Sequence, residues 1–399
     1  MTTDSPPHLT ALTSLRIRWA WTALLCAAWV SGGFFFLRIY WISASAVQWL
    51  ALSAAGAAYL LWILWRGLDY NRREGEKHLF SKLGLGNQLT LCRGALTAAL
   101  AGFLFSPRPD GWLGWIPGSL YTLAAIIDLF DGYAARRTNQ TTQLGEMLDL
   151  SLDGTGVLIA GVLAVQYRQV ASWYLLVAFA RYFFVAGIWL RKRHGLPIYD
   201  LPHSSTRRPF AGAQMGFIAV ILWPLFSPPI TQIAALLFAL PFLARFGLDW
   251  LEISGVIAGR GFRKGRFTRL KHAITRHLPV LLRAIAVTLL AGMTLSEAQM
   301  GKWLPQALTG QVYSSSLIWM TAVIALQGLG VMLLALGAAG RIAALAILFS
   351  RGFHLHFASL TSADILLILC SIGLFLLGTG AYSLWKPEDR LIYRRLGEV

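Results

Sequence analysis

Charged residues are scarce in this chain of 399 residues: only 13% are Asp, Glu, Lys or Arg, while 56% are hydrophobic. A water-soluble domain usually has about a quarter of its residues charged. The shortage therefore excludes an ordinary soluble domain and indicates that lipid is the main solvent. Acidic residues are especially few, with 18 Asp and Glu against 35 Lys and Arg, and the formal net charge is +17.

Cysteine is scarce too, and the three cysteines lie far apart in apolar segments, at Cys26, Cys92 and Cys370. This spacing excludes a disulfide framework and a cysteine-based zinc site, so we expect three small buried hydrophobic residues. A cleavable signal peptide is not predicted, because the first apolar run is too long for one and leads directly into a second apolar run.

Long apolar segments, by contrast, are abundant. A spanning helix needs roughly 20 mostly apolar residues, and on this criterion we predict about twelve spans. They fall near residues 18–37, 44–66, 89–106, 112–134, 147–166, 171–190, 210–227, 230–252, 278–297, 314–336, 339–357 and 363–384. The predicted fold is therefore all-α, a polytopic transmembrane helical bundle.

Basic residues gather in alternate loops between these segments, near residues 66–82, 136–137, 191–208, 260–276 and 386–395. The positive-inside rule places such loops in the cytoplasm. Both termini are then cytoplasmic, in agreement with an even number of spans. The positive charge favours anionic lipid headgroups over nucleic acid as partners. We expect a multi-pass protein of the bacterial inner membrane.

The longest basic stretch, residues 255–277, separates eight predicted spans from the last four. Glycines at 255, 259, 261 and 265 argue against a firm helix in its first half. We interpret the stretch as a basic cytoplasmic linker that lies on the anionic inner leaflet. A solvated loop that obeys the positive-inside rule explains its charge equally well.

Four aspartates form a cluster within the apolar segments. Asp128 and Asp131 are three residues apart at the end of one predicted span, and Asp149 and Asp153 are four apart at the start of the next. Each pair shares one face of its helix. Because a short loop lets the two helices run antiparallel, the four carboxylates can converge just inside the cytoplasmic boundary. Ionisable groups at membrane depth are costly, and they usually mark a functional site.

Four converging carboxylates repel one another unless cations neutralise them. Oxygen-only ligands suit Mg²⁺, Mn²⁺ or Ca²⁺ rather than zinc, and two such ions could clamp the oxygens of a phosphoryl displacement. The neighbours fit a phosphate ligand, because Gly132 allows close backbone approach and Arg136 offers a planar fork. Gly145 suits a tight entry into the second helix. A structural carboxylate network or an ion pathway is the alternative.

The complete pattern that begins at Asp128, D-x2-D-G-x2-A-R-x8-G-x3-D-x3-D, resembles the signature of the CDP-alcohol phosphotransferase (CDP-alcohol phosphatidyltransferase) family. All eight fixed positions match with their spacing intact. Upstream, Asn87, Thr90 and Arg93 stand in an N-x-L-T-x-x-R run that resembles the element opening the family's first helix. The resemblance covers residues 84–254 and implies a six-helix catalytic core, preceded in residues 1–83 by a tail and two extra helices.

The resemblance implies a metal-dependent transferase of phospholipid biosynthesis. It would move a phosphoalcohol, expected to be phosphatidyl, from a CDP-alcohol to an acceptor hydroxyl and release CMP. CDP-diacylglycerol is the expected donor, and a soluble CDP-choline-like donor is the alternative. Two Mg²⁺ or Mn²⁺ ions would be held by Asp128, Asp131, Asp149 and Asp153, and Asp153 would also be the general base. The residues implied around the CDP group are Asn87, Thr90, Gly132, Ala135, Arg136 and Gly145.

The residues expected to bind the acceptor match the family's pattern less closely. Some family members hold a phosphorylated acceptor with a basic residue in a run before a glutamine, and this chain has Arg207 and Arg208 before Gln214, with Ala211 where Thr would stand. We expect a small alcohol or a phosphorylated alcohol as acceptor; the alternative is that both arginines are ordinary cytoplasmic basic residues. Arg181, inside an apolar segment, is expected to face the bundle interior. The family resemblance also implies a homodimer.

Residues 278–399 resemble DoxX-like four-helix membrane domains through two short motifs, which begin at Gly340 and Gly378. This resemblance predicts a C-terminal four-helix domain and no chemistry of its own. For the whole chain, the alternatives to an enzyme are a transporter or a catalytically silent scaffold that uses the same intramembrane carboxylates.

Overall fold

The computed structural model describes residues 7–76, 78–138, 140–201, 207–226, 228, 230–256, 264–300, 313–355 and 359–385. Within these residues the chain forms twelve α-helices and three short 3₁₀ helices, and its only β-type pairing is an isolated bridge between Ala338 and Trp385. The prediction of an all-α fold is confirmed.

The twelve helices correspond one to one to the twelve predicted segments. The first eight are α1 (Pro7–Tyr40), α2 (Ser43–Gly67), α3 (Leu85–Ala101), α4 (Ile116–Arg137), α5 (Gln143–Gln166), α6 (Leu175–Arg193), α7 (Arg207–Leu222) and α8 (Ile230–Ile253). The last four are α9 (Lys264–Met300), α10 (Tyr313–Leu336), α11 (Gly340–Leu355) and α12 (Ser362–Leu377).

Seven helices of the described part are long and apolar enough to cross a membrane, namely α1, α2, α4, α5, α6, α8 and α9. The other five are shorter or are described only in part. For example, α3 has 17 residues and α11 has 16, so each is about 25 Å long against a hydrocarbon core of about 30 Å. The fold class of a helical membrane bundle is thus confirmed, while the five further spans stay predictions.

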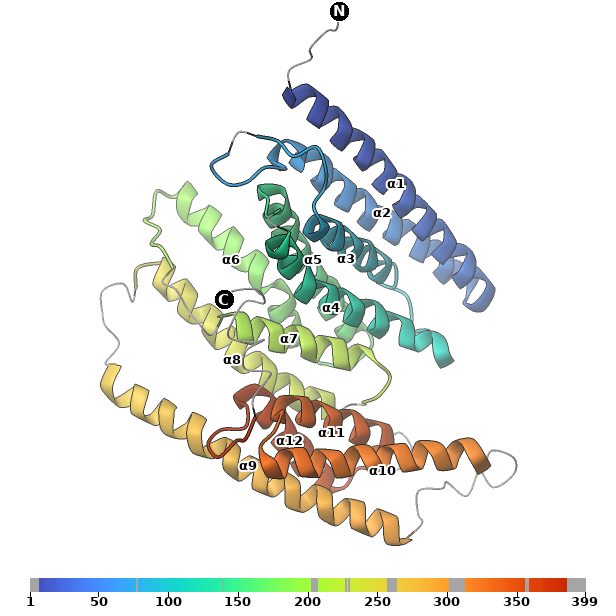
Figure 1. Cartoon of the computed structure of the whole chain (residues 1–399), viewed down its shortest axis with the longest axis vertical. Coiled ribbons are helices and arrows are strands. Elements are labelled where there is room, and N and C mark those ends of the chain that lie inside the picture. Colours follow the sequence, from blue (N-terminus) through green and yellow to red (C-terminus); the bar gives the residue numbers. More distant parts are fainter. Residues whose placement is uncertain are drawn as a thin grey trace, which may run out of the picture.

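The helices form two packed groups (Figure 1). One hydrophobic core runs through α1–α8 and extends into α11 and α12, and a second lies among α9, α10, α11 and α12. The groups meet where α11 and α12 lie against α7 and α8, with the rings of Phe238 and Phe375 6.0 Å apart. The last four helices thus share a second cluster, while a separate C-terminal four-helix domain stays a prediction. Helix α9 begins at Lys264 and continues unbroken past residue 278, so the second half of the predicted linker 255–277 is helical.

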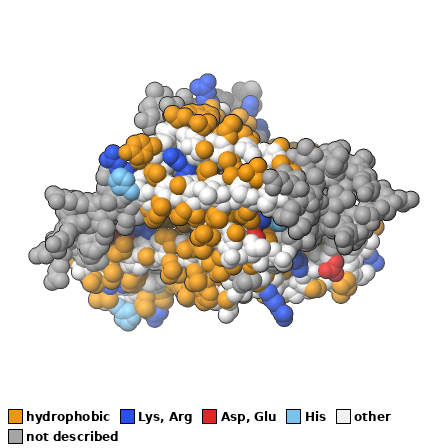
Figure 2. Space-filling view, turned by 90° about the horizontal axis from the view of Figure 1, so that it is seen from below, with side chains coloured by type: hydrophobic (Ala, Val, Ile, Leu, Met, Phe, Trp, Pro, Cys, Tyr) orange, Lys and Arg blue, Asp and Glu red, His pale blue; other side chains and the backbone are white. Residues whose placement is uncertain are grey.

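Large apolar side chains cover much of the outer surface. Figure 2 shows them across one face of the molecule, and α1 alone exposes Trp21, Leu24, Leu25 and Phe35 by 58–67% of their surface. A soluble monomer rarely exposes a contiguous apolar surface of this kind, whereas a surface in contact with lipid has no need to be polar. The exposed apolar side chains therefore fit a membrane bundle.

The prediction of three buried cysteines is correct for Cys26 and Cys370 and wrong for Cys92, which is exposed. Cys92 precedes Arg93 on α3, and neighbouring helical residues point in different directions around the axis. Because Arg93 points into the bundle and is buried, Cys92 points out of it.

Helix α3 is the element that positions the site, because it packs against α2, α4 and α5 together. Its close approach to α4 depends on Gly86. A Cβ atom added there would lie 2.6 Å from Cβ of Ala135 and 3.0 Å from the carbonyl oxygen of Asp131. Both are atoms of α4 that cannot rotate away, so a side chain at this position would push the two helices apart.

We therefore expect Gly86→Ala to lower the free energy of unfolding by about 1–3 kcal/mol, as overpacking does elsewhere. Gly212→Ala is the matched control, since a Cβ atom there would meet no atom within 4 Å and alanine is the better helix former by about 1 kcal/mol. Thermal unfolding of both variants in detergent measures the difference. Equal stability of the two variants would contradict the close α3–α4 contact.

Candidate active site

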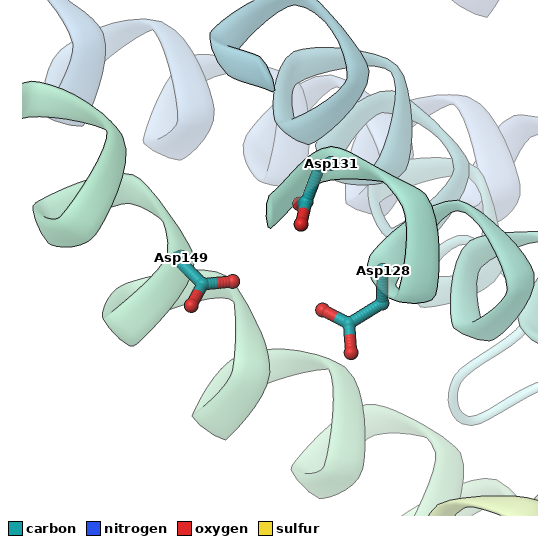
Figure 3. A group of neighbouring side chains, drawn as sticks. All are labelled: Asp128, Asp131 and Asp149. Atoms are coloured by element: carbon teal, nitrogen blue, oxygen red, sulfur yellow. The ribbon is translucent and has the colours of Figure 1, made fainter. Parts of the chain in front are cut away.

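Three of the four predicted aspartates meet between α4 and α5. One carboxylate oxygen each from Asp128, Asp131 and Asp149 lies within 4.8 Å of the others. Figure 3 shows the three carboxylates pointing toward one another, two from α4 and one from the facing α5. The three-residue spacing on α4 places Asp128 and Asp131 on one face, and the antiparallel course of α5 brings Asp149 opposite.

The local sequence fixes where α5 begins and therefore where Asp149 lies. Thr142 is the N-cap residue, and its Oγ1 accepts a hydrogen bond of 3.1 Å from the backbone N–H of Gly145. This is the usual way in which a threonine satisfies a free N–H group at a helix start. Asp149 and Asp153 then follow in the second and third turns, four residues apart.

The three clustered carboxylates fit a divalent metal site. Their oxygens are hard ligands, and ligands around one Mg²⁺ lie about 2.1 Å from the ion and so up to about 4 Å from one another. The spread of 4.8 Å is close enough for small side-chain movements to complete such a set. Asp131 is buried, while the side chains of Asp128 and Asp149 are 24% and 49% exposed, so the group is closed on one side and accessible on the other.

Asp153 lies one turn beyond Asp149 and is joined to the cluster through Arg93. The guanidinium of Arg93, from α3, pairs with Asp128, with Asp149 at 2.8 Å and with Asp153 at 2.9 Å. The Arg93 side chain is only 4% exposed. No role was predicted for this arginine, although it stands in the N-x-L-T-x-x-R run. This role could have been inferred from the sequence, because four carboxylates in an apolar bundle need a buried positive charge.

Thr90, one turn before Arg93 on α3, contacts the remaining aspartate, Asp131. Its hydroxyl donates to Oδ2 of Asp131 at 2.9 Å, and the carbonyl of Gly86, at 3.0 Å, is its other available acceptor. Each of the four aspartates thus has a partner on α3. Thr90 was predicted to frame the CDP group; the structure places it against a candidate metal ligand.

Asn87 and Gly145 lie together where α3 and α5 begin. The Asn87 side-chain amide donates to Oδ1 of Asn71 at 3.2 Å and to Oγ1 of Thr142 at 3.1 Å. A Cβ atom at Gly145 would lie 2.5 Å from Oδ1 of Asn87, so only glycine allows this contact. These two predicted CDP-binding residues connect helix ends inside the protein, and their contact with CDP stays a prediction.

The other predicted CDP-binding residues follow Asp131 on α4. A Cβ atom at Gly132 would meet only the end of the Arg136 side chain, at 3.2 Å, so the backbone here is open to a close ligand. Ala135 packs under Gly86 of α3. Arg136 is partly exposed in the last turn of α4. Their arrangement leaves a basic group and an uncovered stretch of backbone beside the acidic cluster.

The predicted acceptor-binding residues, Arg207 and Arg208, are the first two residues of α7, and their side chains lie outside the described part of the structure. Gln214 of the same helix is buried and donates to the hydroxyl of Tyr174. Arg181 of α6 faces inward as expected, because its Cδ lies 2.9 Å from the position of a Cβ atom at Gly154, next to Asp153.

Comparison with known proteins supports this interpretation of the site. The family model described as CDP-alcohol phosphatidyltransferase matches residues 83–244, a segment that contains α3–α7 and the whole aspartate cluster. The match begins one residue before the predicted catalytic core and ends ten residues before its end. No solved structure matches the chain.

Similar proteins carry related names. A "CDP-diacylglycerol--glycerol-3-phosphate 3-phosphatidyltransferase" of Cereibacter sphaeroides is 38% identical over 89 residues, which are 22% of this chain and 39% of that protein. The protein of the same name from Escherichia coli is 37% identical over 67 residues, 17% of this chain and 36% of that protein. "Choline/ethanolaminephosphotransferase 2" of Arabidopsis thaliana is 40% identical over 65 residues, 15% of this chain and 17% of that protein.

These similarities span less than half the length of each relative, and they leave α1, α2 and the C-terminal helices of this chain outside the family model. The matched segment carries the signature with its eight fixed positions and the cluster that its aspartates form. Residues 83–244 of this chain are therefore a domain of the CDP-alcohol phosphatidyltransferase family.

Proposed function

We propose that the chain transfers a phosphoalcohol from a CDP-alcohol to an acceptor hydroxyl and releases CMP, as a step of phospholipid synthesis. The observation that supports this most strongly is the convergence of Asp128, Asp131 and Asp149 within the matched domain. Carboxylates and a phosphate ligand are both negatively charged, so the cluster can bind phosphate only if cations lie between the two. The signature supplies, beside that cluster, an arginine and an uncovered glycine suited to phosphates.

Asp128, Asp131 and Asp149 would hold the metal, with Asp153 able to share a second ion. Mg²⁺ or Mn²⁺ fits the oxygen-only donor set. When bound, such ions neutralise phosphate charge and stabilise the oxygens that attack and leave. Arg136, at the end of α4, would hold the diphosphate by its planar fork, with Asn87, Thr90, Gly132, Ala135 and Gly145 framing the nucleotide.

Asp153 would act as the general base. It would take the proton of the acceptor hydroxyl while the hydroxyl oxygen forms a bond to the phosphorus that carries the alcohol. The bond from that phosphorus to the bridging oxygen of the diphosphate breaks, and CMP leaves with that oxygen. Asp153 suits this role because it stands outside the three-carboxylate cluster but within one helical turn of Asp149, with 40% of its side chain exposed.

The donor we propose is CDP-diacylglycerol, and the acceptor is a small alcohol or a phosphorylated alcohol such as glycerol 3-phosphate. Two of the relatives are named for these substrates. A lipid-linked donor also suits a site built on helices long and apolar enough to span a membrane. Arg207 and Arg208, at the start of α7, are the proposed contacts of a phosphorylated acceptor.

We further propose an orientation of the enzyme in the membrane. The loops rich in Lys and Arg would face the cytoplasm, together with both termini and the active site. The basic segment 255–277 would lie against anionic lipids of the inner membrane. A homodimer is proposed from the family resemblance.

Replacing the proposed base tests the mechanism. We expect Asp153→Asn to lower the rate of CMP release by about 100-fold to 10,000-fold, because general-base catalysis contributes about that much. The matched control is Asp110→Asn, which changes an exposed carboxylate before the opposite end of α4 and should leave the rate unchanged. Purified protein in detergent with CDP-diacylglycerol and glycerol 3-phosphate provides the assay. Equal rates in the two variants would refute the role of Asp153.

Metal removal tests the cofactor. We expect EDTA to reduce CMP release to background and an excess of Mg²⁺ or Mn²⁺ to restore it, because the carboxylates and the diphosphate repel each other without cations. The control is the EDTA-treated protein kept folded, as judged by its circular dichroism. CMP release that persists in EDTA would rule out the metal. Solute movement across proteoliposomes without CMP release from any CDP-alcohol would indicate a transporter instead.

A further inference from the structure

Arg93 occupies an unusual electrostatic position. Its single guanidinium contacts three carboxylates, those of Asp128, Asp149 and Asp153, which come from two helices other than its own. Its side chain is 96% buried, since only 4% is exposed. A charge buried to this degree needs partners that are fixed in place, and the aspartates are the partners that the structure gives it.

Among the described residues, the aspartates are the only groups that pair with the guanidinium. Its Nε is buried and has no hydrogen-bond partner in the described part of the chain, so Nη1 and Nη2 make all of its polar side-chain contacts there, and these are with the aspartates. By contrast, Asp131 is held by Thr90 and not by Arg93. If the three other carboxylates turned toward a different cation, the arginine would lose its partners and could move.

Two of the three carboxylates that hold Arg93 also belong to the candidate metal cluster. Asp128 and Asp149 pair with Arg93 and offer oxygens to the group of three. A divalent ion among those oxygens would lie within a few ångströms of the guanidinium, and like charges at such a distance repel strongly where water is scarce. The arginine and the ion therefore cannot both be held fully by the same pair of carboxylates.

We propose that Arg93 is an internal counter-ion, which keeps the aspartates assembled in the metal-free protein and competes with the divalent ion for Asp128 and Asp149. This inference rests on the metal site of the proposed function. Arg93 is then a positioning residue whose partners change when metal binds. It sets the metal affinity of the site and prevents the empty carboxylates from separating the helices.

Metal affinity without any substrate tests the competition. Purified protein in detergent is titrated with Mn²⁺, and the free ion is measured by electron paramagnetic resonance. We expect Arg93→Gln to bind Mn²⁺ at least about tenfold more tightly than the unchanged protein, because a unit positive charge a few ångströms from the ion is removed. Unchanged or weaker binding by Arg93→Gln would overturn the proposal.

Arg181→Gln is the matched control. It removes an arginine from the same bundle beside Asp153, but Arg181 makes no ion pair with these aspartates in the described residues. We expect the affinity to change by less than about threefold, since only a screened, non-contact interaction is lost. An equal gain in both variants would show that the site responds to net charge alone, and would contradict a competition at Asp128 and Asp149.

Thermal unfolding separates a counter-ion from a merely structural contact. Arg93→Gln should unfold at a lower temperature than the unchanged protein in EDTA, because its carboxylates repel one another, and saturating Mn²⁺ should remove most of that difference. Equal losses with and without Mn²⁺ would overturn the proposal. If Arg93→Gln does not fold, Arg93→Lys keeps the charge but lacks the fork that spans several carboxylates, and should raise the Mn²⁺ affinity by about threefold.

Failure of this inference is distinguishable from failure of the proposed function. Metal-dependent CMP release together with an unchanged Mn²⁺ affinity in both Arg93 variants would refute the counter-ion role of Arg93. It would not contradict the proposed enzymatic function. Absence of Mn²⁺ binding to the unchanged protein would refute both the metal site and the counter-ion. Loss of Mn²⁺ binding in Asp149→Asn confirms that the titrated site is the aspartate cluster.

Discussion

The structure around the site depends on one constraint: four carboxylates in an apolar helical bundle must be neutralised. Helix α3 supplies the partners, with Arg93 for three aspartates and Thr90 for the fourth. The cost of separating a buried charge from its partners is large. The relative positions of α3, α4 and α5 are therefore tied to the charge state of these aspartates, and the same geometry fits the cation binding that we propose.

Small residues make this arrangement sterically accessible. Gly86 lets α3 approach the backbone of α4 at Asp131, and Gly145 lets Asn87 reach the start of α5. The site thus combines two kinds of residue. The aspartates and Arg136 are the proposed ligands of metal and phosphate, whereas Gly86, Asn87 and Gly145 place the helices that carry them. Proteins that share such a segment can share the site even where the rest of the chain differs, as α1, α2 and the C-terminal helices do here.

Much of this could be predicted from sequence, because apolar segments and charged exceptions within them are local signals. All twelve helices lie near the predicted segments, and the spacing of Asp128, Asp131 and Asp149 was enough to predict their convergence. The role of Arg93 could not be predicted in this way, since its partners stand 35, 56 and 60 positions along the chain. Three other features could not be predicted from local signals either, because each depends on which helix packs beside which. They are the exposure of Cys92, the unbroken course of α9 through Lys264–Met300, and the contacts of Asn87 with Asn71 and Thr142.

In the proposed reaction, the oxygen of an acceptor hydroxyl replaces CMP on phosphorus. This reaction is tested most directly by supplying glycerol 3-phosphate with a heavy oxygen isotope in its primary hydroxyl, together with CDP-diacylglycerol and Mg²⁺, and analysing both products by mass spectrometry. We expect one CMP for each new lipid, with the heavy isotope wholly in the lipid phosphodiester and none in CMP. A heavy isotope in CMP, a lipid product without it, or no CMP with any CDP-alcohol from the folded protein would contradict the proposed reaction.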